Sequence, residues 1–119
     1  MPLFFKFRPG QVVYCKFPRE EDPSLLEDRP CLILSALEKS GAKYYRVAKM
    51  TKTNNSHRFI GIWVLMNSRS GRSMSLDYDT FIHLERIEVV PEFGIRRLKS
   101  ICSIFEDVVQ KCKENDITI

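Results

Sequence analysis

The hydrophobic pattern of the chain changes once, after Pro91, and this change limits the possible folds more than any other feature of the sequence. Before Pro91, short apolar or alternating runs stand between turn-forming residues, which is the pattern of β-strands. After it, apolar residues recur at the three-and-four spacing of one helix face. These residues are Ile95, Leu98, Ile101, Cys102, Phe105, Val108, Val109 and Cys112. The pattern predicts a strand-rich chain closed by one amphipathic helix over residues 95–112.

Several runs have the composition and length of strands. They cover residues 11–17, 30–34, 44–50, 59–66, 80–84 and 87–90. The run at 30–34 is apolar throughout, which predicts a core strand buried on both faces. We expect at least five strands. Together with the terminal helix, they predict a mainly β fold of the small SH3-like barrel type.

The segments between these runs predict turns and loops. Residues 40–43 look like a hairpin turn, and the Ser-, Arg- and Gly-rich residues 67–73 look like a loop. Residues 18–28 are highly charged and carry Pro23, so we expect an exposed and mobile loop there. Gly61, inside a β-prone run, suggests a bulge or a sharp bend.

Length and composition indicate one ordinary globular domain over residues 1–119. The chain is 44% hydrophobic and 29% charged, so it has enough apolar residues for a core. Its net charge of +4 favours anionic partners, although many small proteins are this basic without binding nucleic acid.

The four cysteines show neither CxxC spacing nor companion histidines, and each lies in an apolar run; they are Cys15, Cys31, Cys102 and Cys112. This pattern predicts buried, reduced thiols rather than a disulfide framework or a zinc site. No residue set has metal-ligand spacing, so we expect no metal. Since no apolar stretch is long enough for a signal peptide or a membrane span, we expect a cytoplasmic protein without membrane contact.

Three segments, in this order along the chain, resemble the MazF/PemK family of toxin endoribonucleases from type II toxin–antitoxin systems. They are the Gly-led strand at residues 10–18, the Arg-Pro segment at 28–35, and the strand at 47–54 that ends on a threonine. Residues 76–84 and the terminal helix also resemble the PemK-like branch. The resemblance implies a small SH3-like barrel of the MazF/PemK (CcdB-like) type with a C-terminal helix.

The resemblance also implies an activity, namely sequence-specific and metal-independent cleavage of single-stranded RNA, without a cofactor. In such a reaction the ribose 2′-hydroxyl attacks the adjacent phosphate and leaves a 2′,3′-cyclic phosphate or its hydrolysed product. Arg29 corresponds to the family's catalytic arginine and Thr51 to its threonine. Asp77 corresponds to the acid that some members use near the site. A cognate antitoxin protein and a homodimer are the implied partners.

Basic residues gather in the sequence around Thr51 and in the later loop at 67–73. They are Lys49, Lys52, His57, Arg58, Arg69 and Arg72, and such a set is able to follow an RNA backbone or to be a solvated surface. His57 is a candidate general acid, whereas His83, between Ile82 and Leu84, predicts a residue at the strand surface. Tyr14, Tyr44, Tyr45 and Trp63 suit either base stacking or the core.

Structural roles are open for each of the three catalytic candidates. Arg29 suits a salt bridge to Asp28 or to a loop carboxylate. The Thr51 hydroxyl suits a role in closing the turn at the strand end, and Asp77 suits the formation of a turn over residues 77–79. Two other functions are also open for the whole chain. One is a non-catalytic SH3-like module that binds nucleic acid or protein, and the other is a structural protein that only dimerises.

Overall fold

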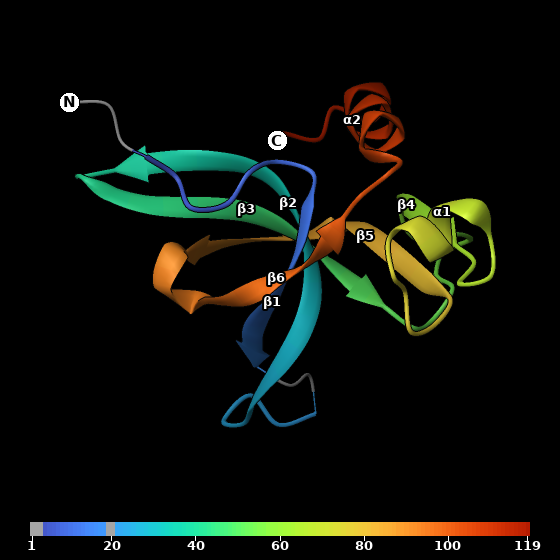
Figure 1. Ribbon diagram of the computed structural model, residues 1–119, viewed down its shortest axis with the longest axis horizontal. Helices are drawn as coiled ribbons and strands as arrows, with labels where there is room; N and C mark the ends of the chain where they lie inside the picture. The colour runs from blue at the N-terminus through green and yellow to red at the C-terminus, as the bar shows by residue number, and fades with distance from the viewer. Residues whose placement is uncertain (1–3, 19–20) are drawn as a thin grey trace.

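A computed structural model describes residues 4–18 and 21–119, and its main feature is one antiparallel sheet of six strands (Figure 1). The elements are β1 (Gln11–Pro18), β2 (Leu26–Lys39), β3 (Ala42–Thr51), β4 (Gly61–Val64), α1 (Arg69–Ser73), β5 (Thr80–Pro91), the 3-10 turn η1 (Glu92–Gly94), β6 (Ile95–Ile101) and α2 (Phe105–Glu114). The strand order is β4-β5-β3-β2-β1-β6. Within the described residues β4 and β6 are therefore edges, and the sheet is open. The predicted mainly β fold with a C-terminal helix is confirmed.

Both faces of the sheet are buried, each in its own apolar cluster. On one face Val12, Leu32 and Ala48, which pair across β1, β2 and β3, pack with Val108 and Cys112 of α2. Their chain neighbours face the other cluster, because side chains alternate along a strand. The prediction that residues 30–34 form a strand buried on both faces is confirmed.

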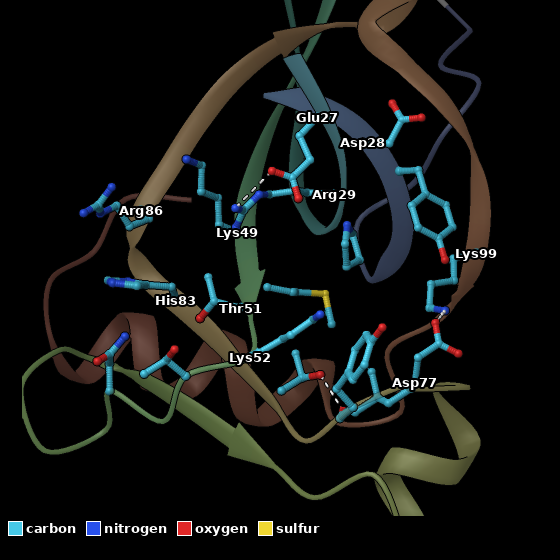
Figure 2. Close-up of a pocket in the computed structure, with 18 of the residues that line it drawn as sticks. Glu27, Asp28, Arg29, Lys49, Thr51, Lys52, Asp77, His83, Arg86 and Lys99 are labelled. Atoms are coloured by element: carbon cyan, nitrogen blue, oxygen red, sulfur yellow. Dashed lines mark hydrogen bonds and ion pairs between the residues drawn. The ribbon is translucent and has the colours of Figure 1, made fainter. Parts of the chain in front are cut away.

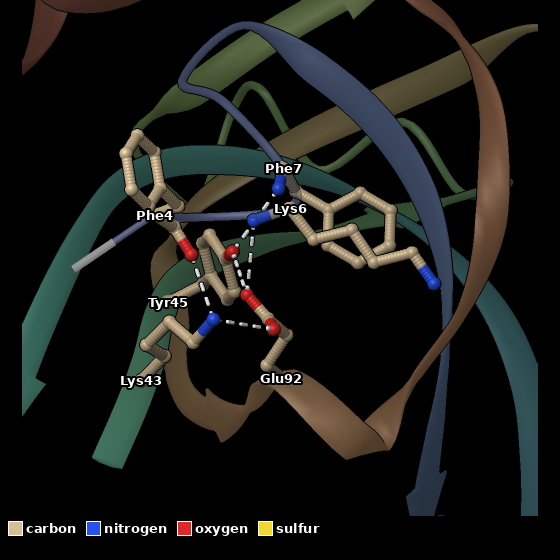
Figure 3. Close-up of polar contacts among 6 residues, drawn as sticks. All are labelled: Phe4, Lys6, Phe7, Lys43, Tyr45 and Glu92. Carbon is tan, nitrogen blue, oxygen red and sulfur yellow. Dashed lines mark hydrogen bonds and ion pairs between the residues drawn. The ribbon is translucent and has the colours of Figure 1, made fainter. Parts of the chain in front are cut away.

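The N-terminal segment covers the second face and is held there by Tyr45 (Figure 3). The buried Tyr45 hydroxyl accepts a hydrogen bond from the Phe7 N–H at 3.1 Å and donates one to Glu92 at 2.5 Å. Lys43 bridges the same cluster, since its ammonium lies 2.7 Å from the Phe4 carbonyl and 3.3 Å from Glu92. Burial and the Glu92 carboxylate together raise the pKa of Tyr45 to about 12. These contacts tie the segment before β1 to the start of η1.

The predicted helix over residues 95–112 is wrong in its first half, which is the edge strand β6. Ile95, Leu98 and Ile101 pair with Cys15, Val13 and Gln11 of β1, with a register shift inside each interval. Each shift inserts one extra residue, so three residues of β6 match two residues of β1. A doubly bulged strand therefore repeats its apolar residues every third position, which imitates the helical period. The second half forms α2 as predicted.

Residues 80–84 and 87–90, predicted as two strands, belong to the single strand β5. Lys49 of β3 pairs with His83, and the preceding Ala48 pairs with Ile87, so three residues of β5 bulge out of the ladder. The predicted break falls in this bulge. The polar residues in the bulge suggested a break between two strands. They are not paired with β3, but they remain part of β5.

Other local expectations are partly confirmed. The hairpin turn holds Ser40 and Gly41 at φ 53° and 81°, the left-handed conformations that a tight β-hairpin requires. Gly61 is the first residue of β4, and the β4–β5 register shows no bulge from Gly61 to Val64. A Cβ there would lie 2.3 Å from the Ile82 carbonyl oxygen, so close strand packing requires the glycine. The predicted loop at 67–73 contains α1, whose N-cap Ser68 accepts a hydrogen bond from the Gly71 N–H at 3.0 Å.

The predicted mobile loop at 18–28 is shorter in the structure, because β2 begins at Leu26. Residues 19 and 20 of that loop lie outside the described residues. All four cysteines are buried with free thiols, and burial raises the pKa of Cys31, Cys102 and Cys112. No helix in the described part of the chain is long and apolar enough to span a membrane.

Candidate functional site

A cleft of about 610 Å³ opens where β2 and β3 separate (Figure 2). The ladder between them ends at the pair Cys31–Lys49. Beyond it β2 runs back to Leu26 paired only with β1, whereas β3 runs on to Thr51 paired with β5. Two walls of the cleft therefore come from strands that diverge. Among its lining residues are five cations, Arg29, Lys49, Lys52, Arg86 and Lys99, and three carboxylates, Glu27, Asp28 and Asp77.

Three of the predicted residues, Arg29, Lys49 and Thr51, lie on one side of the cleft (Figure 2). The Lys49 side chain is buried, with its ammonium 5.0 Å from the centre of the Phe17 ring. Electrostatic interactions of such a charge are stronger than those of an exposed lysine. The Thr51 hydroxyl is buried and has no hydrogen-bond partner among the described residues. A group of this kind is costly unless something else bonds to it, which favours a ligand at this point.

Arg29 forms an ion pair with Glu27, with Nη2 and Oε2 separated by 3.4 Å. The two residues are two apart on β2 and so share one face of the strand. The salt bridge considered from the sequence thus exists, and of the two alternatives it is the one to a carboxylate of the predicted loop at 18–28, namely Glu27. The Arg29 side chain keeps 27% of its surface exposed, so it remains accessible from the cleft.

Asp77 lines the cleft but lies across it from Arg29 and Thr51 (Figure 2). Its carboxylate is 3.0 Å from the Lys99 ammonium of β6. Burial works against the charge of Lys99, but hydrogen bonds to Tyr14 and Asp77 outweigh it and raise the pKa of Lys99. Asp77 therefore lines the cleft in a pair with a lysine of the segment that was predicted as helix.

Aromatic rings stand beside cations on the same wall as Asp77. The Lys52 ammonium lies 3.9 Å from the centre of the Tyr78 ring, and the Lys99 ammonium lies 5.4 Å from that of Tyr14. Both tyrosines line the cleft, whereas Tyr45 is in the core. Pairs of a ring and a cation are suited to stacked bases and neighbouring phosphates.

Four of the predicted RNA-binding residues, His57, Arg58, Arg69 and Arg72, are not among the residues that line the cleft. Arg58 stands over Phe59, which does line it, at 5.3 Å from the ring centre. Arg69 and Arg72 belong to α1. The structure therefore brings together five of the nine predicted site residues.

His83 is not the surface residue predicted from the sequence, because only 4% of it is exposed. Its ring lies 4.9 Å from that of Phe59 and 5.3 Å from that of Phe81, and its Nδ1 accepts a hydrogen bond from the Glu85 N–H at 3.3 Å. Because side chains alternate along a strand, His83 lies on the opposite face of β5 from Ile82. The prediction that His83 is exposed assumed that this second face is open to solvent. That face is covered, and His83 lines the cleft.

The sequence analysis did not select Glu27, Arg86 and Lys99 as site residues. Glu27 lay in the predicted loop at 18–28, and its place beside Arg29 follows from a strand that begins earlier than predicted, at Leu26. Arg86 lies in the β5 bulge and Lys99 in a bulged strand predicted as helix. In the described residues, no group of three or more His, Cys, Asp or Glu side chains is arranged to hold a metal ion.

Comparison with known proteins identifies the family to which the chain belongs. A search of curated proteins found no match to the chain. Residues 8–115 match the family model of the PemK-like, MazF-like toxins of type II toxin–antitoxin systems. The match includes every strand and every residue of the cleft described above. The resemblance seen in three sequence segments is thereby confirmed, and the chain belongs to the PemK-like, MazF-like toxin family of type II toxin–antitoxin systems.

Proposed function

We propose that the protein is an endoribonuclease toxin that cleaves single-stranded RNA at specific sequences, without a metal ion, in the cleft between β2 and β3. One observation carries this proposal. In a chain of this toxin family, Arg29, Lys49 and the unpartnered hydroxyl of Thr51 line one side of the same cleft. Two cations and a hydroxyl donor fit a phosphodiester, which gains negative charge as it is attacked.

Each of these side chains has a distinct role in the reaction. The planar guanidinium of Arg29 is able to hold two phosphate oxygens and to oppose the charge that develops on the phosphorane. The Thr51 hydroxyl donates to the same phosphate and gains a partner, which it lacks among the residues that the structure describes. Lys49 adds a partly desolvated positive charge, whose effect is larger than that of a surface lysine.

The opposite wall of the cleft suits the flanking nucleotides. Tyr14 and Tyr78 offer ring faces for bases, while Lys52 and Lys99 supply charge for the backbone. Asp77 is the remaining predicted catalytic residue, and its position beside Lys99 favours contact with a flanking nucleotide over direct action at the phosphate held by Arg29. His57, Arg58, Arg69 and Arg72 stay predictions, for RNA that extends beyond the cleft.

The proposal includes the partners expected of a toxin of this type. These are a cognate antitoxin protein that holds the toxin inactive, and a second copy of the chain in a homodimer in the cytoplasm. Sedimentation at micromolar concentration tests the dimer, and a monomer there would remove it from the proposal.

The deciding experiment is cleavage of a long single-stranded RNA by the purified protein, with and without EDTA. Cleavage at a few defined positions, unchanged by EDTA and leaving 2′,3′-cyclic phosphate ends, is the expected result. A parallel duplex RNA of the same sequence should stay intact. RNA that binds but is never cut would support the non-catalytic binding module instead.

A further inference from the structure

We propose that the Glu27 carboxylate is the general base that removes the proton from the attacking 2′-hydroxyl. This inference rests on the proposed ribonuclease function. Attack by a ribose hydroxyl needs a base next to the phosphate that is attacked, because a neutral hydroxyl is a poor nucleophile. The base must therefore lie beside the groups that hold the phosphate, and the geometry of the cleft points to Glu27.

Glu27 lies beside the residue that would bind the phosphate. Its Oε2 is 3.4 Å from Nη2 of Arg29, and the two side chains project from the same face of β2 into the cleft (Figure 2). A guanidinium carries five N–H donors, so Arg29 is able to keep this contact while other N–H groups bind a phosphate. A phosphate bound there places its neighbouring 2′-hydroxyl within a few ångströms of the carboxylate.

The exposure of Glu27 suits proton transfer. Its side chain is 41% exposed, so a substrate hydroxyl is able to reach it. The ion pair with Arg29 orients the carboxylate. Glu27 is therefore both reachable and oriented.

The other candidate bases of the cleft are less well placed. Asp28 alternates with Glu27 on β2 and points away from Arg29 (Figure 2). Asp77 lies across the cleft, bound to Lys99. His83 is packed against Phe59 and Phe81 with only 4% of its surface exposed. Of the lining carboxylates, Glu27 is the one in contact with Arg29.

The step is balanced without any additional reagent. The Glu27 carboxylate takes the proton of the 2′-hydroxyl, and the 2′-oxygen forms a bond to phosphorus. The bond from phosphorus to the 5′-oxygen breaks, and that oxygen leaves with the electron pair and takes a proton from water. The resulting hydroxide is neutralised by the proton that Glu27 then releases. The products are a 2′,3′-cyclic phosphate and a 5′-hydroxyl.

The test compares Glu27→Gln with its matched control Glu88→Gln, using a short single-stranded RNA that the wild type cuts. Both substitutions remove one carboxylate by the same chemical change, but Glu88 is exposed on β5 and does not line the cleft. We expect kcat to fall about a hundredfold or more in Glu27→Gln, with KM little changed, which is the scale of a lost general base. In Glu88→Gln, kcat should stay within about threefold of wild type, the range expected of a screened surface charge without a catalytic role.

The pH dependence separates a base from a merely electrostatic group. The wild-type kcat should rise from acid pH in proportion to the ionised fraction of one carboxylate, and Glu27→Asp should keep this rise at a lower rate. In Glu27→Gln the rise should be absent. Because the wild-type profile alone shows whether a carboxylate must ionise, it tests the proposal even if a variant does not fold.

Two results would overturn the inference while leaving the ribonuclease intact. One is a folded Glu27→Gln that binds RNA more tightly and cuts it at the wild-type kcat, which would show that Glu27 only competes with the phosphate for Arg29. The other is a wild-type profile without the acidic rise. A wild type that cuts no RNA would instead overturn the ribonuclease proposal and this inference with it.

Discussion

The Lys99 ammonium of β6 lies 3.0 Å from the carboxylate of Asp77, so the last strand of the sheet reaches the segment before β5 across one wall of the cleft. Only 11% of the Lys99 side chain is exposed, against 67% of the Asp77 side chain. Asp77 is thus the more accessible member of the pair, and in the proposed complex with RNA a phosphate at Lys99 would share the ammonium with Asp77. This relationship makes the contribution of Lys99 to RNA binding measurable through its dependence on salt.

We predict that Lys99→Met weakens RNA binding and reduces the salt dependence of that binding. Each lysine that neutralises a phosphate of a single strand contributes about 0.7 to the slope of log K against log salt concentration, and the variant should lose about this amount. The measurement is a titration of fluorescent single-stranded RNA at several salt concentrations. Lys113→Met is the control, since Lys113 is exposed on α2 outside the cleft. Equal slopes for the two variants would contradict a phosphate contact by Lys99.

Arg29→Ala should cut the turnover of single-stranded RNA by about a hundredfold or more, the loss expected when one preorganised donor to a developing oxyanion is removed. Its fold should be retained, because the ion pair with Glu27 is partly exposed and such pairs contribute little to stability. Cleavage rates and circular dichroism check the two parts. A folded variant that cuts at the wild-type rate would show that Arg29 is not the phosphate-binding residue.

Thr51→Val should lose activity without losing stability. The Thr51 hydroxyl is buried without a partner in the part of the chain that the structure describes, at a cost of about 1–3 kcal/mol, so a valine of the same shape should leave the free energy of unfolding unchanged or raise it. Thr80→Val is the matched control, because the Thr80 hydroxyl donates to the Tyr78 carbonyl at 2.8 Å. That variant should lose about 0.5–1.5 kcal/mol in urea unfolding. Equal losses in both variants would show that the Thr51 hydroxyl has a partner in the free protein.

The Tyr45–Glu92 contact predicts that the stability of the fold decreases at acid pH. The hydrogen bond from Tyr45, followed by the contacts with Lys6 and Lys43, lowers the pKa of Glu92 against the opposing effect of burial. Since the folded state holds this proton less tightly than the unfolded state, the contribution is complete above the usual carboxyl pKa of 4.5 and is lost as the pH falls through the lowered value.

We therefore expect the free energy of unfolding to decrease less between neutral and acid pH in Glu92→Gln than in the wild type. Glu88→Gln, an exposed neighbour on β5, should keep the wild-type slope. Urea unfolding at a series of pH values measures both. Parallel curves for all three proteins would show that Glu92 gains nothing from Tyr45 and Lys43.

The bulged register of β6 also has a consequence for stability. Ile95 is 7% exposed and belongs to the second core, whereas Leu98 is 47% exposed on the edge strand. Ile95→Ala should cost about 2–5 kcal/mol, and Leu98→Ala should cost about 1 kcal/mol or less. A continuous helix over residues 95–112 would bury both side chains on one face, so comparable losses would contradict the strand.

The sequence was sufficient to predict the elements whose pattern is local. The apolar run at 30–34 and the hairpin at Ser40 and Gly41 depend on neighbouring residues, and they appear where expected. β6 was not predictable, because its threefold apolar spacing arises from two bulges against β1, and a bulge is decided by the partner strand. The β5 bulge at residues 84–86 is the same kind of case.

The part of the candidate site that was predicted from the sequence consists mainly of residues that lie near one another along the chain or on adjacent strands. Arg29, Lys49, Thr51 and Lys52 lie on two adjacent strands or directly after one, and the structure brings them into one cleft. His83 and Lys99 join them only through the register of β5 and the bulges of β6. Long-range pairing, which leaves no local pattern, separates the predicted part of the site from the rest.

The position of β1 between β2 and β6 fixes when the protein is able to work during its synthesis. Within the described residues, the outer edge of β1 has no strand to pair with until residues 95–101 have been made. Tyr14 on β1 and Lys99 on β6 stand on the same wall of the cleft, so a nascent chain lacks part of the proposed RNA-binding surface until β6 has left the ribosome. The pairing of β1 with β6 joins strands far apart in the sequence, and contacts of this kind make folding slower than local contacts do.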